Sequence, residues 1–184
     1  GNTKIVLNAY QEVLNKTYNL VDEAQIGRIV GYLNKADRVL VCGCGSSGLS
    51  AKEMEIRFMR IGIDVDSMTD SDMIKMASVF QNRRSLIFGY SISGEREEVT
   101  YLWREANNKG AKTVLFTANN GKKFSEYYSE VVALSSLRHL NYGNVISPQF
   151  PILIILDIIY AYYVEQNKYI REGMHDSTLC ALEE

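Results

Sequence analysis

Apolar positions follow two different periods along this 184-residue chain. Residues 4–18 and 22–35 place apolar side chains three and four positions apart, which predicts two amphipathic helices before any strand. Asp22 and Gln25 match a capping box, in which each side chain bonds the free backbone N–H of the other residue. Short, mainly apolar runs then follow, which predict strands at 38–42, 64–67, 85–90, 112–117 and 130–134.

Helical patterns fill the segments between and after these strands. We expect helices at 48–61, from Thr69 with Asp72 to Phe80, at 94–108, a short one at 122–128, a long one at 146–166, and a partly helical tail. In the long helix, Ser147 is the expected N-cap and Pro148 the first helical residue. Strands that alternate with crossover helices predict an α/β fold: a doubly wound, five-stranded parallel sheet sandwiched by helices, with two N-terminal helices.

Two of the strands run directly into serine-rich turns that open helices. Ser46 and Ser47 follow the strand at 38–42, and Ser91 and Ser93 follow the strand at 85–90. The start of a helix offers unpaired N–H groups and the positive end of its dipole, so phosphate is a suitable ligand. The simpler alternative is that Ser47 and Ser93 only cap their own helices. Two such turns on one sheet favour an anion site.

A dinucleotide site is a second alternative for the first turn. Gly43, Gly45 and Gly48 match the Gly-x-Gly-x-x-Gly spacing, and Asp64 or Asp66 lies about 20 residues further on, where a ribose-binding acid is expected. A second serine turn has no role in a dinucleotide crevice. The pair of turns therefore favours a phosphosugar.

These motifs make residues of about 22–165 similar to a sugar isomerase (SIS) domain, a doubly wound fold that binds phosphosugars through two such turns. Gly45-Ser46-Ser47-Gly48, Ala51-Lys52-Glu53, the segment 57–62 and the helix at 154–160 most resemble the effector domain of RpiR-type transcriptional regulators. The resemblance implies a phosphosugar site formed by Gly45, Ser46, Ser47, Ser91, Ile92, Ser93, Gly94 and Arg96.

Arg96 departs from the family pattern, which has Thr at this position. Two alternatives stay open. Arg96 either reaches back as a charged clamp on the phosphate or points to solvent and weakens the site.

Catalytic members of the family have a Glu eight residues before an Asp that resembles Asp157, and this chain has Gln149 there. An amide cannot abstract a proton, although it can hydrogen-bond a sugar hydroxyl. We therefore expect no catalytic residues and no enzyme activity, with Gln149 and His139 as candidate sugar contacts. A phosphosugar aldose-ketose isomerase is the alternative, in which His139 would serve ring opening.

Composition narrows the partners and the compartment. The 20 Lys and Arg against 22 Asp and Glu give a net charge of -2, which argues against direct DNA binding by this chain. Cys42, Cys44 and Cys180 are too few for a zinc site and do not suggest a disulfide framework, so we expect no metal, no cofactor and a cytoplasmic location. The apolar segment 150–164 is shorter than a bilayer span, so no membrane contact is expected.

The chain begins at Gly1 without a Met, which predicts that an upstream segment is missing. We expect residues 1–21 to form a helix that links to a DNA-binding helix-turn-helix domain, and 22–184 to form the phosphosugar-binding SIS domain. Tyr160, Tyr162 and Tyr163 on the long helix predict a homodimer or higher homo-oligomer. The sequence thus predicts the phosphosugar-sensing effector domain of a bacterial sugar-responsive transcriptional regulator.

Overall fold

The computed structural model describes residues 1–93, 97–119, 124, 127–136 and 145–183, with only the backbone for 97–100 and 169–172. Its helices are α1 (Asn2–Leu20), α2 (Glu23–Lys35), α3 (Ser46–Met59), α4 (Ser71–Ala77), α5 (Glu97–Asn108), α6 (Phe150–Gln166) and α7 (Lys168–Glu183), with a 3₁₀ turn η1 (Ser78–Phe80). Its strands are β1 (Arg38–Cys42), β2 (Val65–Met68), β3 (Ser85–Tyr90), β4 (Lys112–Thr117) and β5 (Glu130–Ala133). Two helices precede the first strand, as predicted.

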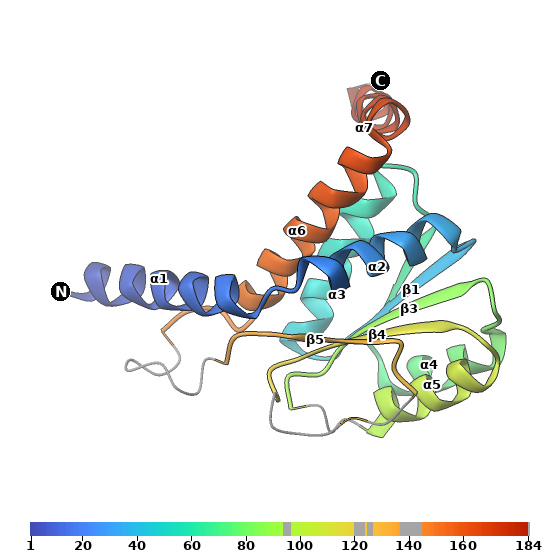
Figure 1. The fold of residues 1–184 in the computed structure, drawn as a ribbon, viewed down its shortest axis with the longest axis horizontal. Helices are drawn as coiled ribbons and strands as arrows, with labels where there is room; N and C mark the ends of the chain where they lie inside the picture. Colours follow the sequence, from blue (N-terminus) through green and yellow to red (C-terminus); the bar gives the residue numbers. More distant parts are fainter. Residues whose placement is uncertain (94–96, 120–123, 125–126, 137–144, 184) are drawn as a thin grey trace.

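The five strands form one parallel sheet in the order β2-β1-β3-β4-β5, which confirms the doubly wound fold. Helices α2, α3 and α6 cover one face, and α4 and α5 cover the other (Figure 1). The chain places β2 on one side of β1 and β3 on the other. The carboxyl ends of β1 and β3 therefore meet at the topological switch point, where ligands of such sheets bind.

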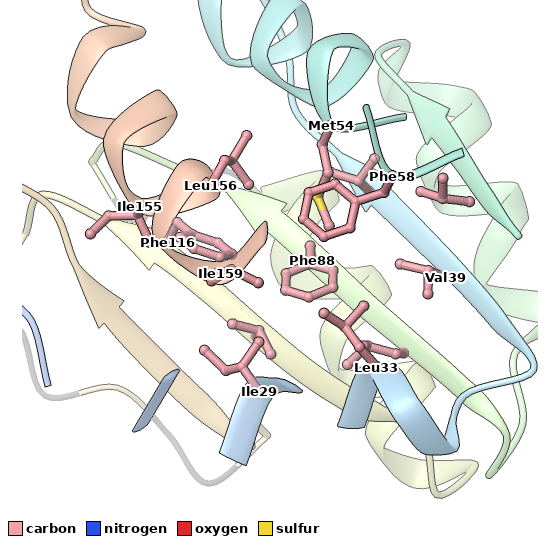
Figure 2. Packing of buried hydrophobic residues seen from close by; sticks show 14 of the residues in the cluster. Ile29, Leu33, Val39, Met54, Phe58, Phe88, Phe116, Ile155, Leu156 and Ile159 are labelled. Carbon is pink, nitrogen blue, oxygen red and sulfur yellow. The ribbon is translucent and has the colours of Figure 1, made fainter. Parts of the chain in front are cut away.

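Apolar side chains fill both faces of the sheet, and all six residues of β3 are buried. Figure 2 shows the larger core, in which Phe88 and Phe116 of the sheet face Met54, Phe58 and the buried side of α6. On the opposite face, Trp103 lies directly against Gly89, where a Cβ atom would come within 2.1 Å of the indole ring. The absence of a side chain at Gly89 thus lets α5 pack closely on the central strand.

Helix starts differ from the prediction by one to three residues. Asp70, rather than Thr69, caps α4 and accepts the backbone N–H groups of Asp72 and Met73. Helix α6 begins at Phe150 instead of Pro148, with Gln149 as its N-cap residue. The Ser147 hydroxyl accepts the Gln149 N–H before the helix begins, because the chain makes a turn there.

One of the two hydrogen bonds of the predicted capping box at the start of α2 is present. The Asp22 carboxylate accepts the Gln25 N–H at 3.2 Å. The side-chain amide of Gln25 instead donates to the Val131 carbonyl at 2.9 Å and so ties α2 to β5. The Gln25 side chain, which the local pattern predicted to bond the Asp22 N–H, thus makes a tertiary contact with β5 instead.

The short helix predicted at 122–128 lies mostly outside the described residues, and Phe124, Tyr127 and Tyr128 have no helical backbone. The tail prediction was too cautious, because α7 is a helix from Lys168 to Glu183. Within the described ranges, no helix combines the length and apolar character needed to span a membrane.

Two of the three tyrosines on α6 pack inside the domain. Tyr163 is 1% exposed, and Tyr160 packs edge-on against Phe58, which leaves Tyr162 at 38%. The surplus of aromatic surface on which we based the dimer is therefore smaller than the sequence suggested. The homodimer stays a prediction.

Candidate functional site

The register of the central strands brings the two serine turns together. Cys42, the last residue of β1, lies beside Gly89 of β3, so the chain leaves both strands at neighbouring points of the same edge. Residues 43–47 and 91–93 therefore adjoin at the switch point. The sequence had placed them on separate strands, and the strand order makes them neighbours.

Close packing explains the glycines of the first turn. A Cβ atom on Gly43 would lie 2.5 Å from the Ser47 carbonyl oxygen, and one on Gly48 would lie 3.0 Å from the Gly43 oxygen. Gly45 has φ 59°, a left-handed conformation that favours glycine. The Gly-x-Gly-x-x-Gly spacing is thus required by the turn itself, without a dinucleotide.

Ser46 and Ser47 lie inside the first turn of α3 and do not cap it. Gly45 is the N-cap residue, and among the described residues no side chain caps this helix. The Ser46 side chain is exposed and Ser47 is 9% exposed. The alternative in which Ser47 only caps its own helix is therefore wrong, and the helix start is open to an external acceptor.

The second turn is held by the loop that follows β4. The Ser91 N–H donates to the Phe116 carbonyl at 3.1 Å, and the Thr117 hydroxyl donates to the Ile92 carbonyl at 3.1 Å. The Asn119 side-chain amide donates to the Ser93 carbonyl at 2.8 Å. Sequence reasoning missed Thr117 and Asn119, although their positions, at the end of β4 and just beyond it, were a usable signal.

Ser91 has the most unusual environment among the predicted site residues. It is 3% exposed, and its hydroxyl has no hydrogen-bond partner among the residues that the structure describes. A buried polar group left unpaired costs about 1–3 kcal/mol. Its neighbours differ, since Ile92 is 37% exposed and Ser93 is half-buried.

Gln149 reaches the same region from the start of α6. It is half-buried, and its Oε1 accepts from the Ser50 hydroxyl at 3.4 Å. Ser50 is fully buried and lies four residues after Ser46, on the same face of α3. The sequence analysis had not selected Ser50, since nothing in the local pattern indicates a partner 99 residues away.

Three predicted site residues, Gly94, Arg96 and His139, lie outside the described residues. Both alternatives for Arg96 therefore remain predictions. The proposed use of His139 as a sugar contact is likewise a prediction.

The buried titratable groups near the turns are poor proton carriers. Burial raises the pKa of the Cys42 thiol, and it raises the pKa of the Tyr90 phenol well above its ordinary value. The Tyr90 hydroxyl donates to the sulfur of Met54 at 3.3 Å. Over the part of the chain that is described, no three His, Cys, Asp or Glu side chains lie close enough to hold a metal ion.

The fold and the paired turns together define a doubly wound α/β domain with two serine turns at its switch point. A model of the SIS domain family matches residues 32–155. The chain belongs to the SIS domain family.

Among curated proteins, the chain is similar to full-length bacterial regulators. It is 30% identical over 171 residues to an uncharacterized HTH-type transcriptional regulator of Haemophilus influenzae, covering 93% of this chain and 59% of that protein. It is 27% identical over 184 residues to the uncharacterized HTH-type transcriptional regulator YbbH of Bacillus subtilis, covering 96% and 62%. The chain thus spans about three fifths of the length of these relatives.

Solved structures share the fold at low sequence identity. The Vibrio vulnificus NanR protein complexed with ManNAc-6P matches with a TM-score of 0.88 and 18% identity, covering 100% of this chain and 69% of that one. The sugar isomerase domain of the Sphaerobacter thermophilus RpiR transcription factor matches with a TM-score of 0.80 and 17% identity, covering 97% and 96%. The hypothetical protein MJ1247 of Methanococcus jannaschii, with an inferred function of 3-hexulose-6-phosphate isomerase, matches with a TM-score of 0.70 and 19% identity, covering 95% of each chain.

Proposed function

We propose that this chain is the phosphosugar-sensing effector domain of a bacterial, sugar-responsive transcriptional regulator. DNA binding would belong to a helix-turn-helix domain in the part of the regulator relatives that this chain does not cover. The observation that carries the proposal is the meeting of two serine turns at the switch point, where the buried Ser91 hydroxyl has no partner among the described residues.

A phosphate group would supply what these turns lack. The uncapped start of α3 offers backbone N–H groups, from which phosphate oxygens would accept hydrogen bonds, and the positive end of the helix dipole, which would attract the phosphate charge. Ser46, Ser47, Ser91 and Ser93 would add hydroxyl donors. Because the Ser91 hydroxyl is buried, ligand entry would require the groups that cover it to move. The remaining proposed contacts of the site are Gly45, Ile92, Gly94, Arg96, His139 and Gln149.

The groups that surround this site favour a sensor over an isomerase. An aldose-ketose isomerase needs a general base that is ionised near neutral pH. The Gln149 amide cannot fill this role, and the raised pKa values keep Cys42 and Tyr90 protonated. Among the described residues, these three groups supply no such base, and a site without a base would hold the sugar unchanged, as a sensor requires.

The sensing mechanism needs two states of different affinity. In a cytoplasmic homodimer, phosphosugar binding would favour one arrangement of the two protomers and so bias the attached DNA-binding domains. The similarity to HTH-type transcriptional regulators supports this role.

Calorimetry with a panel of hexose and amino-sugar 6-phosphates tests the proposal. We expect at least one phosphosugar to bind, and a Ser91→Ala/Ser93→Ala double variant to lose about a hundredfold in affinity, since hydrogen bonds to charged groups contribute about 1.5–3 kcal/mol each. Ser177→Ala is the matched control, because this exposed hydroxyl donates to the Gly173 carbonyl within α7. A double variant that binds as tightly as the parent would overturn the site.

A phosphosugar isomerase is the second candidate, favoured by the fold that the chain shares with MJ1247. Incubation with fructose 6-phosphate, followed by detection of the aldose, separates the two functions. Turnover that survives Gln149→Ala would establish an enzyme that uses another base. The sensor proposal predicts binding without turnover.

A further inference from the structure

The Ser50 hydroxyl contacts one end of the Gln149 amide. The Gln149 Oε1 atom is only an acceptor, so in this contact the Ser50 hydroxyl is the donor. The 3.4 Å separation is longer than the usual distance for a hydroxyl donor, which leaves room for the bond to shorten when a ligand is bound. With Oε1 engaged, the Gln149 NH₂ group is the part that remains for a ligand.

The position of this contact relative to the serine turns matches the length of a phosphosugar. Ser46 opens α3 and Ser50 lies four residues further on, a rise of about 6 Å. This rise is comparable to the width of a pyranose ring. A sugar whose phosphate binds at the start of α3 would reach Gln149 if its other end extended along this helix.

The two helices that carry the pair are fixed against each other by a second contact. Arg57 of α3 forms an ion pair with Asp157 of α6, and its guanidinium lies 4.4 Å from the centre of the Tyr160 ring. Asp157 lies two turns after Gln149, so α3 and α6 are joined at two levels. This arrangement holds the Gln149 amide in place before the ligand arrives.

We propose that Ser50 is a positioning residue that fixes Gln149 as a hydrogen-bond donor and so determines the class of phosphosugar bound. The site selects sugars with an acceptor oxygen at the end opposite the phosphate, and it rejects those with an ammonium group there. This inference rests on the proposed phosphosugar site. It adds to that proposal a prediction of which phosphosugars the site prefers.

The physical reason is a mismatch of donors. An ammonium group has three N–H donors and no acceptor, and the Gln149 NH₂ group also only donates. Placed together, both groups lose hydrogen bonds that they make with water. A site built to bond one group discriminates against the analogue that leaves polar groups unpaired.

An isosteric pair of ligands tests this inference by calorimetry. Glucose 6-phosphate and glucosamine 6-phosphate differ only in a hydroxyl or an ammonium at carbon 2, at a pH that keeps the amine protonated. We expect the parent to bind glucose 6-phosphate about tenfold more tightly. In Ser50→Ala the amide is free to turn, so the preference falls to about threefold or less while the affinity for inorganic phosphate is unchanged.

A second variant keeps the test valid if Ser50→Ala fails to fold. Gln149→Glu replaces the donor by a carboxylate of the same shape that still accepts from Ser50, so the preference should reverse in favour of glucosamine 6-phosphate. A merely structural role of Ser50 would weaken all three ligands equally.

The failures of the two proposals are distinguishable. If the parent binds phosphosugars but shows no preference, or if neither variant changes the preference, the role of Ser50 and Gln149 is overturned and the phosphosugar site stands. If the parent binds neither a phosphosugar of the panel nor inorganic phosphate, the proposed function itself fails and this inference fails with it.

Discussion

The Asn119 side-chain amide donates to the backbone oxygen of Ser93 at 2.8 Å, and this bond joins the loop after β4 to the second serine turn. The Asn119 backbone N–H donates to the Thr117 hydroxyl, which in turn donates to the Ile92 carbonyl. Thr117 and Asn119 thus hold the second serine turn by hydrogen bonds to its backbone carbonyls. Residues that would not touch the phosphate help to fix the ones that would.

Asn119→Ala should therefore weaken phosphosugar binding more than it weakens the fold. Without the amide, the Ser93 carbonyl loses its donor, and we expect affinity to fall about fivefold, in keeping with one hydrogen bond of about 1 kcal/mol. Calorimetry measures the affinity and thermal unfolding the stability. Asn15→Ala is the control, because the Asn15 side chain accepts from Gln11 in an exposed contact within α1. Equal affinities of the Asn119→Ala variant and the parent would contradict this supporting role.

The central strands were predictable because their apolar runs are too short for a buried helix. Residues 85–90 and 112–117 are short apolar runs bounded by polar residues, and the structure has both strands at these bounds. Helix starts were less predictable, since adjacent residues compete for the cap. Thr69 and Asp70 both suit the position, and Asp70 takes it with two hydrogen bonds.

The candidate site was predictable only as far as local sequence reaches. The two serine turns are readable because each follows its own strand directly. Ser50, Thr117 and Asn119 were missed because their partners lie 25 to 99 residues away, so only the strand order and helix packing bring them together. A strand end marks residues such as Thr117 and Asn119 as candidates, but a pattern within one segment does not show which distant residue each one contacts.

Gly43→Ala should damage both the fold and the site. The new Cβ atom would lie 2.5 Å from the Ser47 carbonyl oxygen, a backbone atom that cannot move without displacing the start of α3. We expect a loss of about 2–4 kcal/mol in the free energy of unfolding, by chemical denaturation, and loss of phosphosugar binding.

Gly27→Ala is the matched control for this substitution. Gly27 lies within α2, and a Cβ atom there would meet nothing within 4 Å. Alanine favours the helix by about 0.5–1 kcal/mol, so this variant should be more stable than the parent. If both glycine variants changed stability alike, the close contact of Gly43 would not be the cause.

Buried Cys42 should make the protein less stable at alkaline pH. Burial raises the pKa of its thiol above the ordinary value of 9.0, so the folded state keeps a proton that the unfolded state releases. The stabilisation is complete below pH 9 and is lost as pH rises above it, by about 1.4 kcal/mol at pH 10. Denaturant unfolding between pH 7 and 10 measures this slope.

Replacement of each cysteine identifies the group responsible. Cys42→Ala should reduce the alkaline slope, whereas Cys180→Ala should not, because Cys180 is exposed on α7. The Tyr90 phenol is buried as well and adds to the loss only above about pH 10. An unchanged slope in Cys42→Ala would show that another group titrates.

Thr17→Val should loosen α1 while leaving the sheet intact. The Thr17 and Ser135 hydroxyls lie 2.6 Å apart in a buried contact, and Ser135 also donates to the Val13 carbonyl, which leaves Thr17 as the donor of the pair. Valine keeps the volume but removes this donor, at a cost of about 1 kcal/mol. Amide hydrogen exchange in α1 should then become about fivefold faster, with exchange in β3 unchanged.

This measurement also bears on the proposed regulator, in which α1 would connect the sensor to its DNA-binding domain. The apolar contacts of Ala9 and Val13 with Ile146 and the Thr17–Ser135 pair hold α1 against the loops that precede α6 and follow β5. Tyr18→Ala is the control, because Tyr18 is 86% exposed and its loss should not alter exchange in α1 beyond the change in helix propensity. If Thr17→Val left the exchange of α1 unchanged, the Thr17–Ser135 contact would not anchor this helix, and a signal to an attached domain would have to pass through other contacts.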